Sequence, residues 1–306
     1  MLTVFNGMWA VFAAFARMFA AWPQVALAIF SLVTAVLALV VWKYFSNQKG
    51  ITRAKDLIKA NFLAMVLFGD SLGVLLGSIA RTFGWIFVYL ARQMVPLVLM
   101  MIPILPMLVQ VDNLYSFSPI VIDETGKHDA AEVEVVAVVD PTVNLFDLHA
   151  NLTADAGVKT TTDGVRIPFP QHPKSDWEQW PLIGGWLRDS RLEKEPPSPE
   201  VHWRINGQTP GEHTLTIAIG EHQAQKSVIV TEPDKLKQLF PITRKRHRGG
   251  FGDSFEFPGE TALTGAIQSV EILYPRRDGW WHWILIYLIE TLIVAFALKG
   301  PMKVDF

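Results

Sequence analysis

Residues 25–42 have the sequence VALAIFSLVTAVLALVVW, in which one serine and one threonine are the only small polar side chains. A helix rises about 1.5 Å per residue, so a helix of this length nearly crosses a hydrocarbon core about 30 Å thick. Trp22 precedes the stretch, Trp42 ends it and Lys43 follows it, which is typical of a helix at the two faces of a bilayer. We therefore predict a transmembrane helix over residues 21–43, with a helix buried in a protein core as the alternative.

Two further apolar stretches predict spans over residues 91–111 and 280–298. The first contains three prolines, so its helix should be kinked or partly broken. Arg92 stands at its start, where the side chain can extend to the interface, and Gln110 marks its exit. Glu290 lies in the middle of the second stretch, where a carboxyl group is costly unless it is protonated, paired or turned toward protein or water. It is either part of a polar groove or a structural hydrogen bond to a neighbouring helix.

The composition agrees with an integral membrane protein. The 306 residues are 50% hydrophobic and 18% charged, whereas an average soluble domain is about 25% charged. The net charge of −2 gives no sign of nucleic-acid binding. Because the sequence has no cysteine, disulfides, thiolate chemistry and cysteine-ligated metals are excluded. We expect no cofactor.

The charges after the first span set the expected orientation. This segment contains five cationic residues and one anionic residue, Asp56. The cationic residues are Lys43, Lys49, Arg53, Lys55 and Lys59. This excess predicts a cytoplasmic segment, and the last four of these cations form a candidate basic surface. Residues 299–306, with two lysines, form a cytoplasmic tail on the same side. The expected location is a cell membrane, the bacterial inner membrane, with residues 1–20 and 112–279 outside.

Residues 44–90 predict a basic helical hairpin in or under the cytoplasmic leaflet rather than another span. Since both the basic segment and the tail are cytoplasmic, the chain must cross the bilayer an even number of times between them, and the two later spans already supply two crossings. The arms cover residues 52–68 and 70–90. Thr52 is the expected N-cap of the first arm, and Gly69 with Asp70 forms the turn.

Residues 1–20 are apolar and aromatic, with Arg17 as the only charge. A typical signal peptide has a basic first segment, which is missing here. We predict an interfacial helix that leads into the first span, and a frayed terminus is the alternative.

Residues 112–279 differ from the rest because their apolar runs are short and rich in β-branched residues. The predicted strands are residues 132–139, 201–205, 213–219, 225–231 and 269–273. Short strands separated by turn residues favour an antiparallel β-sandwich-like domain outside the cytoplasm. The fold class is therefore an α+β membrane protein: three transmembrane helices, a helical hairpin and this domain.

Two features suggest surfaces for partner proteins. Gly73 and Gly77 form a small-xxx-small pair that permits close packing of helices. Trp177, Trp180 and Trp186 lie in a proline-rich segment that either docks on a membrane or partner, or covers the edge of the domain.

The remaining motifs give no sign of an enzyme. Residues 244–248 (RKRHR) either meet lipid phosphates or form a solvated loop. His202 and His213 lie on neighbouring predicted strands and could approach each other, but the histidines do not have metal-ligand spacing. There is no phosphate-binding glycine loop. We therefore expect neither a catalytic residue nor a metal site.

The segment WKYFSNQKGITRAKDLIKANFLAMVLFGD (residues 42–70), followed by Pro96 in the next span, carries a resemblance of layout. Together with an outside start and a late third span, it resembles the three-span branch of the YidC-like membrane insertase superfamily. The resemblance implies a polar groove, open to the cytoplasm and to lipid, that lowers the barrier for a client helix to enter the bilayer. Bacterial insertases typically place an arginine inside the first span, whereas residues 25–42 contain none, and the insertion at 112–279 is a second departure.

Three functions fit these features. The first is a non-catalytic subunit or scaffold of a larger membrane assembly, with lipids and other membrane subunits as partners. The second is an insertase-like factor for membrane-protein biogenesis that receives client helices in a groove lined by Arg92, Gln110 and Glu290. The third is a receptor for a ligand on the outer side.

Overall fold

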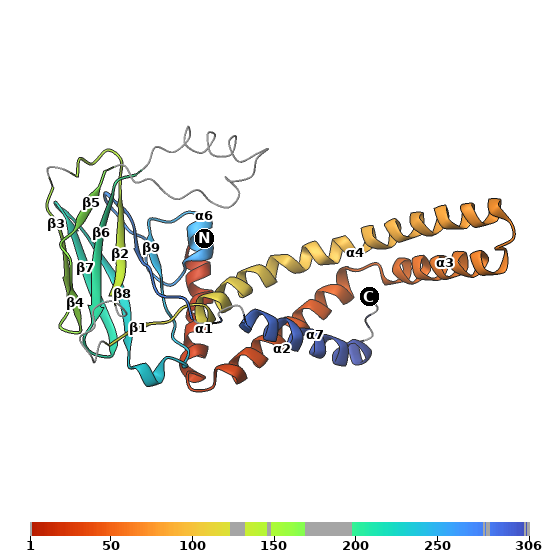
Figure 1. The fold of residues 1–306 in the computed structure, drawn as a ribbon, viewed down its shortest axis with the longest axis horizontal. Coiled ribbons are helices and arrows are strands. Elements are labelled where there is room, and N and C mark those ends of the chain that lie inside the picture. The colour runs from red at the N-terminus through yellow and green to blue at the C-terminus, as the bar shows by residue number, and fades with distance from the viewer. Residues whose placement is uncertain are drawn as a thin grey trace. The chain divides into compact units, whose positions relative to one another are not determined.

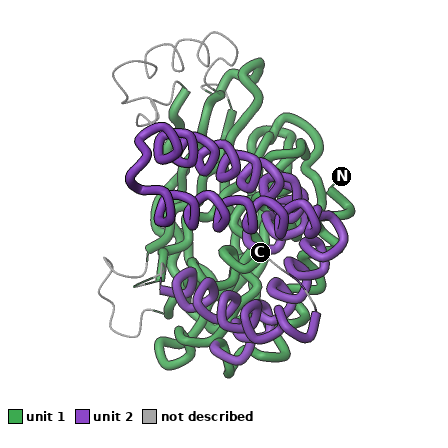
Figure 2. The backbone as a smooth tube through the Cα atoms, turned by 90° about the vertical axis from the view of Figure 1, so that its right-hand side faces the viewer, with its two compact units in different colours: residues 1–23, 109–280 green, residues 24–108, 281–306 purple. Residues whose placement is uncertain are grey.

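The computed structural model describes residues 2–122, 132–145, 148–168, 198–277, 279, 282–302 and 304. The chain divides into two compact units, which Figure 2 shows in different colours. Residues 1–23 and 109–280 contain the sheets, and we call them the β unit. Residues 24–108 and 281–306 contain the long helices, and we call them the helical unit.

Four helices build the helical unit (Figure 1): α2 (Pro23–Phe45), α3 (Gln48–Leu67), α4 (Leu72–Tyr115) and α7 (His282–Met302). Three of them, α2, α4 and α7, are long and apolar enough to cross a membrane. They overlap the three stretches that the sequence predicts as spans, 21–43, 91–111 and 280–298. The prediction of three apolar helices of membrane length is therefore confirmed.

The α3–α4 hairpin turns where its sequence predicts. α3 ends at Leu67 and α4 begins at Leu72, so the turn includes Gly69 and Asp70. The N-cap, however, is not Thr52. Asn47 caps α3, and its side chain accepts a hydrogen bond of 3.0 Å from the backbone N–H of Gly50. Asparagine is a strong N-cap because its short side chain satisfies an otherwise unpaired N–H.

α4 is one uninterrupted helix of 44 residues, although Pro96, Pro103 and Pro106 lie inside it. The alternative of a partly broken helix is therefore wrong. The predicted second arm (70–90) and the predicted span (91–111) belong to the same helix, with no boundary between them. At about 1.5 Å per residue the helix is about 66 Å long, more than twice the thickness of a hydrocarbon core.

Two sheets form the body of the β unit (Figure 1). The first has the order β1 (Ile120–Val121), β8 (His222–Thr231), β7 (Gly211–Ile219), β3 (Ala150–Ala154). The second has the order β4 (Val158–Thr160), β6 (Glu200–Gly207), β2 (Glu132–Val139), β10 (Ile267–Ile272), β9 (Lys245–His247), with β5 (Val165–Ile167) also paired to β6. β1 runs parallel to β8 and the other pairs are antiparallel, so the purely antiparallel expectation needs this correction.

Both sheets contribute to one hydrophobic core. In β2 the alternate residues Val133, Val135, Ala137 and Val139 are buried, as the two-residue period of a strand requires. Trp203 on β6 belongs to the same cluster, together with buried residues of β7, β8 and β10. The longer strands are those that this alternation predicts. β1, β4, β5 and β9 were not predicted, because strands of two or three residues are too short to show it. β3 was not predicted either, because Leu152 is its one buried residue.

The described part of the β unit also contains the end of α4, the helices α1 (Leu2–Met18) and α6 (Phe251–Glu256), and the 3₁₀ turn η2 (Pro233–Lys235). α1 is not a lone helix, because one of its faces packs on α6. The ring of Phe5 meets the rings of Phe251 and Phe255 edge-on, with centroids 6.0 and 5.7 Å away. The opposite face leaves Val4, Val11 and other apolar side chains exposed.

A buried ion pair anchors α1 to the sheets. Lys226 of β8 has a fully buried side chain, and its ammonium donates to Glu260 Oε1 at 2.6 Å. The backbone carbonyl of Glu260 accepts a hydrogen bond of 2.9 Å from the Asn6 side chain of α1. Gly259 has a φ of +118°, and a Cβ there would come within 2.6 Å of the Trp9 ring. The close approach of α1 therefore depends on both the ion pair and this glycine.

Candidate functional site: a polar cluster among apolar helices

Four polar side chains of the helical unit meet between two apolar helices. Ser31 and Thr34 stand three residues apart on α2, and Tyr287 and Glu290 stand three residues apart on α7. Residues with this spacing share one face of a helix, so the two pairs can face each other. We call these four residues the polar cluster.

Hydrogen bonds join the cluster into a chain. The Ser31 hydroxyl donates to Glu290 Oε2 at 3.0 Å and lies 3.4 Å from the Tyr287 carbonyl oxygen. The Tyr287 hydroxyl donates to Thr34 Oγ1 at 2.7 Å, and Thr34 donates to the Phe30 carbonyl at 2.8 Å. The hydroxyl groups thus find acceptors without water, as polar groups between apolar helices must.

The cluster is not buried evenly. Ser31, Thr34 and Tyr287 are buried, whereas Glu290 is half-buried. Among the described residues, Ser31 is the side chain that bonds the Glu290 carboxyl group, and it does so at Oε2. The cluster therefore has a closed end of hydroxyl groups and an open end that carries a carboxyl group.

The structure does not unite the predicted groove residues Arg92, Gln110 and Glu290. The Arg92 guanidinium donates to the carbonyl of Gly50 at the start of α3. Gln110 belongs to the β unit, is fully buried, and has no hydrogen-bond partner for its side chain among the residues described. Glu290 is bonded to Ser31 instead. These partners come from distant parts of the chain, and the sequence alone could not show them.

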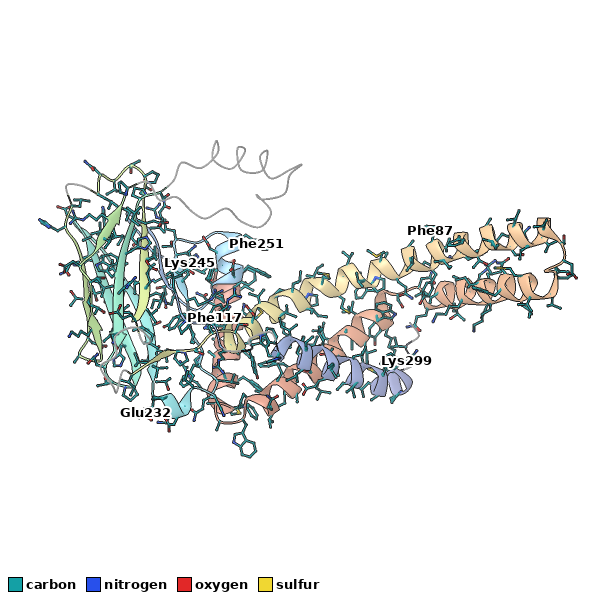
Figure 3. The ribbon with its side chains drawn as sticks, viewed as in Figure 1. Phe87, Phe117, Glu232, Lys245, Phe251 and Lys299 are labelled. Carbon is teal, nitrogen blue, oxygen red and sulfur yellow. The ribbon has the colours of Figure 1, made fainter. Side chains whose placement is uncertain are left out.

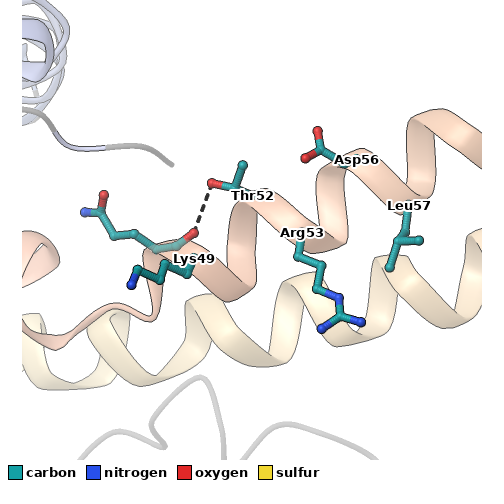
Figure 4. Close-up of a pocket in the computed structure, with 6 residues that line it drawn as sticks. Lys49, Thr52, Arg53, Asp56 and Leu57 are labelled. Atoms are coloured by element: carbon teal, nitrogen blue, oxygen red, sulfur yellow. Dashed lines mark hydrogen bonds between the residues drawn. The ribbon is translucent and has the colours of Figure 1, made fainter.

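The predicted basic surface is split over α3. Lys49 and Arg53 line a shallow, open depression of about 560 Å³ together with Asp56 (Figure 4). The ammonium of Lys55 lies over the ring of Tyr89 on α4, 5.7 Å from its centroid, and Lys59 is exposed. The depression is shallow and is lined by side chains of opposite charge, so it does not resemble a closed ligand pocket.

The predicted partner-docking residues have different outcomes. A Cβ at Gly73 would meet nothing within 4 Å, and one at Gly77 would meet the Arg81 side chain at 4.0 Å. The described part of the chain therefore places no other helix against these glycines. Trp177, Trp180 and Trp186 lie outside the described residues.

Large apolar side chains are exposed along α4 from its start to Leu105, whereas its last ten residues contain none. The exposed side chains include Leu72, Leu76, Phe83 and Phe87 in the first half and Val95, Val98 and Ile102 in the second. Phe87, labelled in Figure 3, is 70% exposed. The sequence showed that these residues are apolar, but their exposure within the chain is a finding of the structure.

The basic run 244–248 is not a solvated loop. Its middle forms β9, which pairs with β10. The Arg244 guanidinium lies over the Phe117 ring at 4.0 Å, and Lys245 pairs with Asp253 at 3.1 Å. Phe117 and Lys245 are labelled in Figure 3. Each of these cations thus has a partner inside the β unit, which accounts for the run without a lipid phosphate.

The two histidines do not approach each other as neighbours, because β6 and β7 belong to different sheets. His202 pairs with Glu134 at 2.6 Å, and His213 pairs with Asp155 at 2.8 Å. Hydrogen bonds from backbone N–H groups, chiefly that of Thr214, lower the pKa of Asp155. Within the described residues, no group of three or more possible metal ligands occurs.

Comparisons with protein-family models, with curated proteins and with solved structures found no match for this chain. The function is therefore inferred from the geometry of the chain itself. That geometry offers apolar surfaces, a half-buried carboxyl group and paired charges.

Proposed function

We propose that the chain is a non-catalytic integral membrane subunit, or scaffold, of a larger membrane assembly. The length of α4 carries this proposal. A bilayer can cover about 20 residues of an apolar helix, whereas α4 has 44. Exposed apolar side chains occur from Leu72 to Ile102, a helical stretch about 45 Å long, whereas a hydrocarbon core is about 30 Å thick. Lipid cannot cover them all, so part of the row requires a protein partner.

We further propose that α2, α4 and α7 cross the bilayer, with the start of α3 in the cytoplasm. The support is the excess of cations in α3 and the lysine at the end of α7. The β unit would then be extracytoplasmic, its two sheets forming a sandwich-like domain. The exposed apolar face of α1, with Val4 and Val11, would contact the lipid interface.

Gentle purification tests the subunit role. We expect the chain, extracted in mild detergent and analysed by mass spectrometry, to carry at least one partner in fixed stoichiometry, because an apolar surface outside lipid must be covered. A lone monomer under these conditions would contradict the proposal.

The polar cluster supports a second candidate, an insertase-like factor distantly related to the YidC-like superfamily. A half-buried carboxyl group and three hydroxyls between apolar helices could ease the passage of polar groups of a client helix. On this hypothesis, depletion of the protein leaves small membrane proteins uninserted, measured by their protease accessibility in isolated membranes. Normal insertion after depletion would remove this candidate and leave the subunit role intact.

A further inference from the structure

Glu290 lies between the buried and the exposed face of α7. Tyr287, one turn before it, is buried and bonded to Thr34. Ile289 and Ile293, on the other side of the carboxyl group, are 57% and 62% exposed. A helix that packed against these two isoleucines would therefore also reach the carboxyl group, since residues three apart lie on the same face.

The carboxyl group has more acceptor capacity than its neighbours use. A carboxylate has two oxygens and about four acceptor positions. Within the described chain, one hydroxyl donates to it, that of Ser31 at 3.0 Å. In an apolar surrounding a carboxylate is stable only when a cation or several donors compensate its charge. One hydroxyl supplies only part of this compensation, and the exposed side is where a further donor or a cation can approach.

The chain cannot supply this cation from its own spans. Residues 25–42, 93–109 and 283–298 contain no lysine or arginine. Lys43 and Lys299 follow the first and third of these stretches. Arg81 and Arg92 precede the second stretch, and Arg92 is bonded to the backbone of α3. A second copy of the chain therefore offers no cation at the depth of Glu290. Lipid ammonium groups lie at the headgroups, far from the middle of a span.

We propose that Glu290, with Ile289 and Ile293 beside it, is a docking surface for a transmembrane helix of another protein that carries a lysine or arginine near its middle. The proposal rests on the membrane-subunit function and specifies the chemistry of one partner. Ser31 fixes the carboxyl group at Oε2 and leaves the exposed side for the incoming cation. Charge-assisted hydrogen bonds between a cation and a carboxylate are about twice as strong as neutral ones, which favours this occupant over an uncharged polar helix.

The test uses the full chain in phosphatidylcholine nanodiscs and fluorescent leucine–alanine helices of about 20 residues. Association is measured by energy transfer for peptides with a central lysine, leucine or glutamine. We expect the lysine peptide to associate about tenfold more tightly than the leucine peptide, in the range of polar contacts between membrane helices. Glu290→Gln should remove this preference. Glu290→Asp, which keeps the charge, should retain part of it.

Thr291→Val is the matched control, because it changes the neighbouring residue of α7 and should leave the preference unchanged. Equal association of the lysine and leucine peptides would overturn the proposal, and so would a preference that survives Glu290→Gln. Equal binding of the lysine and glutamine peptides would also overturn it, since a neutral carboxylic acid would then be the binding group. The subunit role fails separately, if the wild-type chain purifies without any partner.

Discussion

Replacing Glu260 with glutamine is expected to lower the free energy of unfolding of the β unit by about 3 to 5 kcal/mol, the cost of leaving a buried charge unpaired. The Lys226 side chain is fully buried, and burial lowers the pKa of its ammonium. Glu260 accepts hydrogen bonds from this ammonium and from the hydroxyls of Ser227 and Thr243, all at one oxygen. Denaturant unfolding of the full chain in detergent, followed by tryptophan fluorescence, measures the loss.

Two variants make this prediction specific. Glu256→Gln removes an exposed carboxylate 3.8 Å from Arg244, and a long ion pair with one exposed partner should contribute less than about 1 kcal/mol. The double variant Lys226→Met with Glu260→Gln removes both charges and should recover most of the lost stability. A double variant as unstable as Glu260→Gln alone would show that the ion pair is not the cause.

The same residue predicts how stability depends on pH. Burial alone would raise the pKa of Glu260, but the Lys226 ammonium and the hydroxyl donors hold it below its ordinary value. Between that lowered pKa and an unfolded value of about 4.3, the unfolded chain binds more protons than the folded one. Stability should therefore fall as the pH drops through this window, and more steeply for the wild type than for Glu260→Gln. Equal slopes would contradict the assignment.

The long helices and strands could be predicted from sequence because local patterns determine them. The uninterrupted apolar run 25–42 predicts α2, and the alternation of apolar and polar residues at the start of EVEVVAVV predicts β2. The three prolines misled the prediction for α4. A proline removes one donor and strains the preceding turn, but a long helix keeps enough other hydrogen bonds to continue through it.

Contacts between distant residues could not be predicted. The docking of α1 depends on Phe5 meeting Phe251 and Phe255, which no local pattern encodes. The run 244–248 resembled a solvated loop because five basic side chains repel each other. Its aromatic and acidic partners, among them Phe117 and Asp253, come from other parts of the chain.

The sequence identifies the polar positions of the cluster but not their pairing. Glu290 was conspicuous as a carboxyl group inside an apolar stretch. Ser31 and Thr34 were recognisable as the polar positions of the first span, with the three-residue spacing that places them on one face. Their pairing with Tyr287 and Glu290 required the arrangement of α2 against α7, which a single sequence does not give.

Changing Phe83 and Phe87 together to glutamine is expected to reduce co-purification of the partner by about tenfold or more. Two aromatic rings that become buried in an interface each contribute more than about 1 kcal/mol to the binding free energy. These residues lie four apart on α4, so they share one face, and both rings are more than half exposed within the chain. The stability of the isolated chain should change by less than about 0.5 kcal/mol per substitution, because neither ring is buried in it. Quantitative mass spectrometry after mild extraction measures the partner, and the leucine pair at the same positions is the control.

The absence of cysteine allows a direct test of what covers this face. A single cysteine at Phe87→Cys should resist a water-soluble maleimide in the intact assembly and react once a harsher detergent has removed the partner. Reaction at the same rate in both states would show that water, not protein, surrounds this part of α4. Protection that persists after the partner is removed would assign the face to detergent or lipid. Either result would contradict a protein partner on this face, because such a partner requires that protein covers the apolar side chains of α4 beyond the bilayer.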